Sequence, residues 1–216
     1  MSKKNQAVES VTVTAPNFQT AEFNIKGVAP YVQLRFSQKV KYQLLEKMAT
    51  EGKASKGKRN VRDYEEEFLQ SMYEGPKKER GIPAAAFRKA MVSACKTVGF
   101  KMTLAKLSVF VIQDGWDAKQ PQVPLVRIYG DPVKQEDMAR VETGQPYVCV
   151  RAAYHGWSSK LVIRWDADQF TIDDIFNLLT RVGQQVGICE GRPDSKKSAG
   201  MGWGLFEVVD GKLLSR

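Results

Sequence analysis

The hydrophobic positions of this chain follow two different periods. Near the start, Phe23 and Ile25 alternate with polar neighbours, which predicts a half-buried β-strand that Gly27 and Pro30 then interrupt. Further strands are predicted where apolar and β-branched residues cluster, at residues 107–112, 123–129, 147–153, 160–165 and 205–209.

A helical period occupies the segments between these strands. It begins at Ser37, and a second helix is predicted from Asn60, a residue type that caps helix N-termini well, through Met72 and Tyr73. Residues 37–79 therefore predict a helical hairpin.

Two later helices have clearer signals. Pro83 fits a first helical turn, and Phe87, Met91, Cys95 and Val98 then share one stripe before a glycine at residue 99. The other helix follows Thr171, where Asp174 completes the spacing of a capping box.

These elements alternate without regular βαβ spacing, so the pattern favours an α+β fold with helices on one face of a mostly antiparallel sheet. The 216 residues suit a single domain, residues 1–216, in which residues 37–79 form an insertion.

Composition excludes some classes of protein. No apolar run approaches the length of a membrane span and no signal peptide is recognisable, so we expect a cytoplasmic protein with no membrane partner. Cys95, Cys149 and Cys189 lack CxxC spacing, which argues against a disulfide framework or a zinc site, and we expect reduced thiols that are mostly buried. No cofactor motif or GxxxxGK[ST] loop occurs.

Charge adds a possible partner. The formal net charge is +9, and residues 39–106 alone carry an excess of eight positive charges. Such an excess attracts nucleic acid, although a merely solvated lysine-rich face would have the same composition. Five of the cations lie in or beside a Gly/Ser/Lys segment that has no large apolar residue: Lys53, Lys56, Lys58, Arg59 and Arg62.

The helix at Pro83 offers one candidate contact. Ala84, Ala85 and Ala86 leave the backbone N–H groups of the first turn open to a phosphate, and Arg88 and Lys89 follow them. A helix start packed closely on the sheet is the alternative, and for this segment taken alone it is the favoured explanation of the alanines.

A glycine-rich segment offers a second. Residues 187–204 contain five glycines interleaved with cations and a tryptophan, and they can expose backbone donors, positive charge and a stacking ring together. The alternative is a glycine-lined loop packed on a helix. The candidate binding residues in this segment are Gly191, Arg192, Lys196, Lys197, Gly200, Gly202, Trp203 and Gly204.

Together these two segments resemble the RAMP superfamily of CRISPR-associated RNA-binding proteins, especially the backbone-type subunits that coat guide RNA. Residues 82–91 (IPAAAFRKAM) are similar to the family's IPxSSLKGxLR segment, but the serines are missing and Lys89 stands where glycine is usual. The glycines from 187 to 204 are similar to a GxGxxxxxxGxG loop, although Cys189 and Glu190 interrupt it. Residues 151–157 also resemble an RAxxxxW strand of some bacteriophage proteins.

The resemblance implies a ferredoxin-like, RRM-like core that binds single-stranded RNA or DNA along its backbone. It also implies side-by-side assembly as a homo-oligomer or within a multi-subunit ribonucleoprotein.

Catalytic chemistry has few candidates. His155 is the only histidine, so it is the one possible histidine base of a metal-independent endoribonuclease, an activity found in some RAMP proteins. The acidic pairs Asp173/Asp174 and Asp166/Asp168 are interpreted as structural. The favoured function is therefore non-catalytic nucleic-acid binding. Two alternatives remain. One is a RAMP-type endoribonuclease, and the other is a phage structural protein whose basic face meets an acidic protein.

Overall fold

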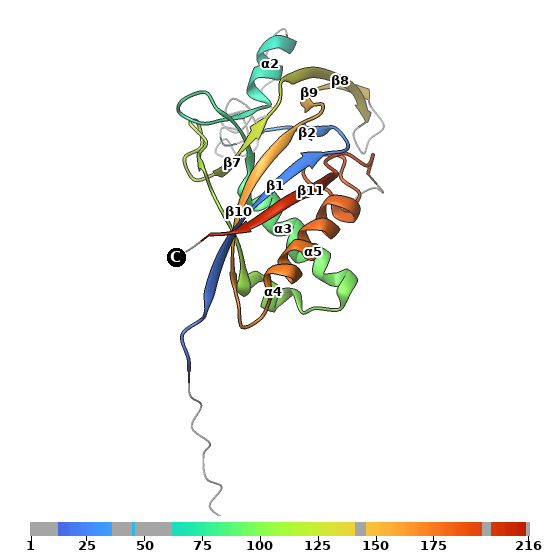
Figure 1. The fold of residues 1–216 in the computed structure, drawn as a ribbon. Coiled ribbons are helices and arrows are strands. Elements are labelled where there is room, and N and C mark those ends of the chain that lie inside the picture. Colours follow the sequence, from blue (N-terminus) through green and yellow to red (C-terminus); the bar gives the residue numbers. More distant parts are fainter. Residues whose placement is uncertain (1–12, 36–44, 46–61, 141–145, 196–199, 215–216) are drawn as a thin grey trace, which may run out of the picture.

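The computed structural model describes residues 13–35, 45, 62–140, 146–195 and 200–214 (Figure 1). In chain order the elements are β1 (Phe18–Gly27), β2 (Tyr31–Gln33), α2 (Tyr64–Gln70), β3 (Tyr73–Glu74), β4 (Arg80–Pro83), α3 (Ala84–Ala94), the 3-10 turn η1 (Cys95–Val98), α4 (Met102–Ser108), β5 (Val109–Ile112), β6 (Gly115–Trp116), β7 (Pro124–Tyr129), β8 (Pro132–Arg140), β9 (Pro146–Tyr154), β10 (Ser158–Asp166), α5 (Ile172–Arg181), the π-turn η2 (Val182–Val186) and β11 (Phe206–Leu213).

The larger of two sheets has the strand order β11-β1-β10-β7-β4-β3. Strand β5 pairs with the second half of β10, from Val162 to Trp165, and β7 pairs with the start of β10, so both lie on the same side of it. Every pairing among the described strands is antiparallel. This confirms the predicted α+β class with a mostly antiparallel sheet.

Alternation along the strands gives this sheet two different faces. Phe23 of β1 and Ile163 of β10 point to the same side as the helices, where Phe87 of α3 and Ile175 of α5 join them in one buried cluster. In Figure 1, α3 and α5 run close together beside the strands. The even-numbered residues of β1 and β10 lie on the opposite side, which we call the open face.

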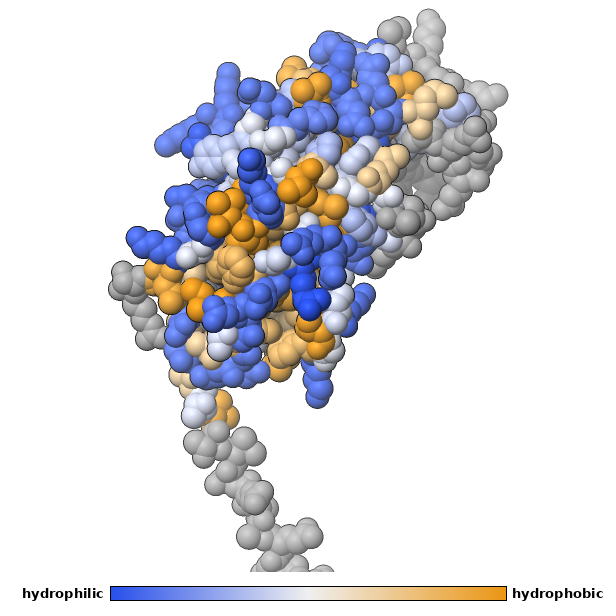
Figure 2. Space-filling model, turned by 45° about the vertical axis from the view of Figure 1, so that its right-hand side comes forward, coloured by the Kyte–Doolittle hydropathy of each residue, from blue (hydrophilic) through white to orange (hydrophobic). Residues whose placement is uncertain are grey.

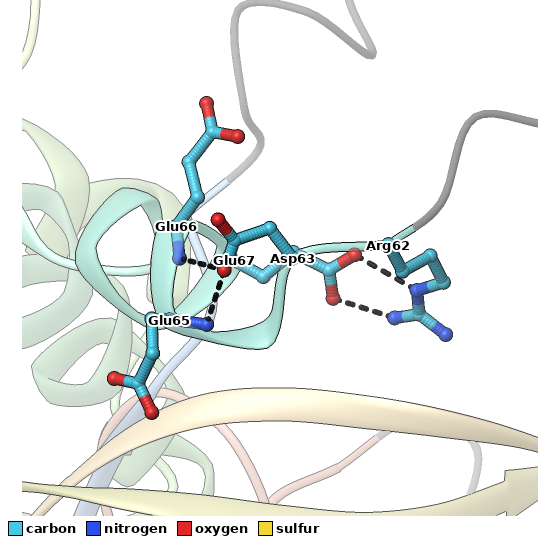
Figure 3. A network of polar contacts seen from close by, with 5 residues as sticks. All are labelled: Arg62, Asp63, Glu65, Glu66 and Glu67. Atoms are coloured by element: carbon cyan, nitrogen blue, oxygen red, sulfur yellow. Dashed lines mark hydrogen bonds and ion pairs between the residues drawn. The ribbon is translucent and has the colours of Figure 1, made fainter.

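The smaller sheet, β2-β9-β8, lies at the end of the molecule that carries α2 (Figure 1). Helix α2 begins at Tyr64 rather than at Asn60, because Asp63 caps it and accepts hydrogen bonds from the backbone N–H groups of Glu65 and Glu66 (Figure 3). It ends at Gln70, so Tyr73, predicted on this helix, lies in β3 instead. The remainder of the predicted hairpin, residues 37–61, lies outside the described residues apart from a single helical residue, Leu45.

Helix α3 matches its prediction at the start and departs from it at the end. Phe87 and Met91 are fully buried, as expected from their spacing. The helix then tightens at Cys95 into the 3-10 turn, and Gly99 ends it in a left-handed conformation. Val98, which the stripe places on the core side, is therefore exposed.

A chain of mostly buried polar groups links the glycine-rich segment to strands β2 and β9 of the smaller sheet. The thiol of Cys189 donates to the hydroxyl of Tyr31 (3.4 Å), and Tyr31 donates to Oε1 of Gln33 (2.9 Å). Gln33 in turn donates to the hydroxyl of Tyr154 on β9 (3.4 Å). Burial raises the pKa of Cys189 to about 11 and that of Tyr154 to about 12, so both groups are protonated at neutral pH.

The surface is mixed. On the side turned forward in Figure 2, hydrophobic residues form several groups between hydrophilic ones, as on the surface of most proteins. Within the described part of the chain, no helix has the length and apolar character needed to cross a bilayer.

Candidate nucleic-acid interface

The glycine-rich segment follows η2 and folds tightly on itself. Gly200 and Gly204 both have positive φ, and a Cβ added at either one would lie 2.1 Å from a backbone carbonyl oxygen, of Arg192 and Ile188 respectively. No side chain fits at such a distance. These two glycines are therefore required by the packing of the loop itself.

Gly202 differs from its neighbours. Its φ is +74°, but a Cβ added there would meet no atom of the described residues within 4 Å, and the preceding side chain, Met201, is 69% exposed. Of the glycines at 200, 202 and 204, Gly202 is thus the one whose backbone lies open to an approaching ligand.

Of the three candidate cations of this segment, the structure describes one, Arg192. Arg192 donates from Nη1 to the carbonyl oxygen of Cys189 (2.8 Å), which fixes its guanidinium against the loop. Lys196 and Lys197 lie outside the described residues.

Helix α3 turns its two basic residues in different directions. Arg88 donates to the carbonyl oxygens of Val109 (3.0 Å) and Lys106 (2.5 Å), so its guanidinium links α3 to α4 and β5. Lys89 is exposed and lies one turn before Ser93, whose hydroxyl donates to Asp194 of the glycine-rich segment (2.6 Å). The fold therefore brings Lys89 to the side of α3 that meets this segment, and gives Arg88 partners within the protein.

The predicted basic loop falls mostly outside the described residues, namely Lys53, Lys56, Lys58 and Arg59. Arg62 is described, and its guanidinium makes two hydrogen bonds to the carboxylate of Glu67 (2.8 and 2.5 Å), shown in Figure 3. The bond to Glu67 raises the pKa of Arg62. A phosphate would have to compete with this carboxylate.

The candidates for catalysis are placed as follows. His155 is exposed in the turn between β9 and β10. Asp174 forms the predicted capping box with Thr171, and Asp166 accepts from the backbone N–H of Asp168 (3.2 Å). Among the described residues no group of three His, Cys, Asp or Glu side chains could hold a metal ion.

The open face contains an aromatic and basic cluster that our sequence analysis missed. The guanidinium of Arg164 on β10 lies 4.9 Å from the ring centre of Phe18 and 5.3 Å from that of Phe110. The two rings meet edge to face at 5.8 Å. Arg164 is exposed and both rings are partly exposed, so solvent reaches a cation flanked by aromatic rings.

The same face continues along β7. Tyr129 is 45% exposed and lies opposite Ser158 of β10, and the guanidinium of Arg127 is 5.2 Å from its ring centre. Lys160 is exposed beside them and pairs with Glu22 (3.1 Å). One signal for this cluster was present in the sequence: an aromatic residue, Tyr129, at a position of a strand where a polar residue is expected. The sequence does not show which strands become neighbours, so the cluster itself could not be predicted.

A scan against protein-family models finds no match, and a search of curated proteins finds none either. Among solved structures, the chain is similar to one chain of "Cryo-EM structure of the Type III-B Cmr-beta bound to cognate target RNA", with a TM-score of 0.45 and 10% sequence identity. The similarity covers 91% of this chain and 61% of that chain, so it spans about three fifths of the longer protein.

Proposed function

We propose that this protein binds single-stranded RNA or DNA along its backbone, without cleaving it, as a RAMP-like subunit that assembles side by side with further copies or with other subunits. The fold that we propose for it is ferredoxin-like. In its favour, β1, α3, β5, β10, α5 and β11 follow one another in a β-α-β-β-α-β order, with other elements inserted between them. Their strands pair in the order β11-β1-β10-β5.

The observation that carries the proposal is the aromatic and basic cluster on the open face. A four-stranded sheet that stacks bases on exposed aromatic rings is a common way to hold single-stranded RNA. Here Tyr129 supplies an exposed ring and Phe18 and Phe110 supply partly exposed ones, and Arg164 and Arg127 supply charge for phosphates within about 5 Å of those rings. Stacking tolerates every base, so this face suits binding that is largely independent of sequence.

The glycine-rich segment supports a second contact. Gly202 presents open backbone beside the exposed Met201, and Lys89 lies on the adjoining side of α3. We propose that a strand reaches this segment after the open face, or that a neighbouring copy presents its strand here.

The experiment measures binding of fluorescently labelled oligo-U and oligo-dT by anisotropy over a series of salt concentrations. Arg164→Ala is expected to weaken binding and to reduce the slope of log K against log[salt] by about 0.7, the value for one phosphate contact on a single strand. Tyr129→Ala is expected to lose about 1–3 kcal/mol of binding energy through lost stacking.

Two control variants remove a matching ring or a matching positive charge away from the open face. Tyr147 is 44% exposed but belongs to the smaller sheet, and Lys96 is an exposed cation at the end of α3. Tyr147→Ala and Lys96→Ala are expected to bind like the unaltered protein. Equal losses in the test and control variants would exclude the open face as the binding surface, and no salt-dependent binding at all would exclude the function.

A further inference from the structure

A pocket of about 370 Å³ opens between β4, β6, β7 and the turn that joins β3 to β4. Its lining includes one large aromatic side chain and five charged ones: Trp116, Lys77, Arg80, Arg127, Glu79 and Asp114. A volume of this order suits a small organic ligand. None of the motifs in the sequence analysis pointed to it.

Glu79 has an unusual environment for a carboxylate. Its Oε2 is buried and has no hydrogen-bond partner among the residues that the structure describes. Its Oε1 lies against Gly75, where an added Cβ would come within 2.4 Å of it, so the glycine makes room for this side chain. A buried carboxylate oxygen without a donor is costly, by about 1–3 kcal/mol or more. If the Glu79 side chain turned toward the pocket, Oε2 would accept N–H groups from a ligand, and that penalty would be removed.

Trp116 provides a surface on which a flat ligand can stack. It lies on β6, pairs with Pro124 of β7 and is 45% exposed, which is high for a tryptophan. An indole that is exposed at the mouth of a pocket is suited to stacking on a planar ring.

The cations of the pocket are not equivalent. Arg80 pairs with Glu74 at 3.1 Å, which neutralises it, and the backbone N–H of Arg127 donates to Asp114 (2.8 Å) while its guanidinium lies over Tyr129. Lys77 is exposed on the turn. The side chains of Lys77 and Arg127 therefore remain as the positive groups for an anionic part of the ligand.

We propose that this pocket binds one guanine nucleotide. The base would stack on Trp116, its N1–H and 2-amino group would donate to Glu79, and its phosphate would meet Lys77 or Arg127. Guanine fits because its Watson–Crick edge presents two adjacent donors to one carboxylate. Adenine and cytosine place an acceptor beside their amino group, and uracil flanks its single N–H with two carbonyl oxygens that a carboxylate repels.

The position of the pocket connects it to the proposed function. The inference rests on that function only where it assigns the guanine to a bound strand. Arg127 belongs both to the pocket and to the open face, where it contacts Tyr129. A strand crossing the open face could place one splayed-out base in the pocket, which would add a preference for guanine at one position to otherwise sequence-tolerant binding.

The test is calorimetric titration of the full chain with GMP, IMP, CMP and UMP. IMP is the sharpest comparison, because it differs from GMP only in lacking the 2-amino group. We expect GMP to bind at least five-fold more tightly than IMP. We expect the difference in affinity between GMP and UMP to be larger than that between GMP and IMP. Equal affinity for GMP and UMP would overturn the proposal.

Glu79→Gln keeps the shape of the side chain and removes its charge. It is expected to weaken GMP binding by ten-fold or more and to abolish the difference between GMP and IMP. The melting temperature is expected to stay the same or rise, because the carboxylate oxygen has no partner to lose. The control is Glu136→Gln, which alters an exposed carboxylate on β8 and is expected to change neither the affinity for GMP nor the melting temperature. A Glu79→Gln variant that retains the preference for GMP would overturn the proposal.

A pair of oligonucleotides separates this inference from the proposed function. Oligo-U and oligo-U with one central guanosine are expected to bind with different affinities, and Glu79→Gln to remove the difference. Binding of both oligonucleotides with equal affinity would overturn the guanine pocket and leave the proposed function standing. Binding of GMP but of neither oligonucleotide would retain the pocket and overturn the function.

Discussion

The indole ring of Trp203 lies directly against Gly191, so that a Cβ added at Gly191 would come within 2.4 Å of Cε3 of the ring. The backbone N–H groups of Trp203 and Met201 both donate to the carbonyl oxygen of Gly191 (3.2 and 2.7 Å). This contact closes the glycine-rich segment on itself and leaves Trp203 only partly exposed.

A comparison of two alanine variants tests this packing. Gly191 and Gly202 both have positive φ, +62° and +74°, but only Gly191 lacks room for a Cβ. Gly202→Ala is expected to cost about 1 kcal/mol of folding stability through backbone strain alone, and Gly191→Ala about 2–4 kcal/mol because the ring must also move. Urea unfolding measures both, and equal losses would contradict the contact.

Gly202 is also the glycine whose backbone is open to a ligand. Gly202→Val is expected to lower the affinity for single-stranded oligonucleotides by about ten-fold, or about 1.4 kcal/mol. Because valine tolerates positive φ poorly, the variant will also melt earlier, so affinity is measured well below its melting temperature. Unchanged affinity in the folded protein would leave the glycine-rich segment with a packing role only.

Arg88 and Lys89 are adjacent on α3 and are expected to respond differently to truncation. Arg88→Ala removes two hydrogen bonds to the carbonyl oxygens of Val109 and Lys106, and we expect a loss of about 2 kcal/mol of folding stability. Lys89→Ala is expected to change stability by less than about 0.5 kcal/mol and to weaken nucleic-acid binding. Denaturant unfolding and anisotropy on the two variants separate these effects. A stable Arg88→Ala variant with a pure binding defect would show that Arg88 faces the ligand.

The buried polar chain through Cys189 predicts sensitivity to alkaline pH. Burial raises the pKa of Cys189 from 9.0 to about 11 and also raises that of Tyr31 above its ordinary value. The unfolded state therefore releases these protons at lower pH than the folded state, so stability is unaffected below about pH 9 and falls as pH rises toward 11. Cys189→Ser keeps a hydroxyl donor for Tyr31 without an ionisation in this range, and we expect the decline to begin at higher pH. An identical pH profile for both proteins, measured by thermal melting, would exclude Cys189 as a contributor.

His155 tests whether the protein is an endoribonuclease. We expect no cleavage of bound RNA in the presence of EDTA, and no change in binding or stability on His155→Ala, because the side chain is exposed in a turn. Gel analysis of labelled RNA after long incubation is the measurement. Strand scission that His155→Ala abolishes would establish the catalytic alternative in place of the proposed function.

Several elements could be predicted because their signal is local. The alternation at Phe23 and Ile25, the stripe with Phe87 and Met91, and the capping box at Thr171 each depend on residues a few positions apart, and all are present in the structure. Strand β8 could not be predicted in this way. Its residues are mostly polar, with Val133 and Met138 exposed, because it forms an edge of the smaller sheet and is held by pairing with β9 rather than by burial of one face.

For the candidate site, the sequence by itself determined the excess of positive charge and the glycines with their accompanying tryptophan. Only the tertiary structure decided how those residues are used: Gly200 and Gly204 pack against carbonyl oxygens, while Gly202 stays open. The same holds for the other two features. The cluster on the open face combines residues of separate strands, namely Phe18, Phe110 and Arg164, and the pocket combines residues of a turn and of strands, among them Glu79 and Trp116. Periodicity tells which face of its strand a residue occupies, but the pairing of strands distant in the sequence decides which residues share that face as neighbours.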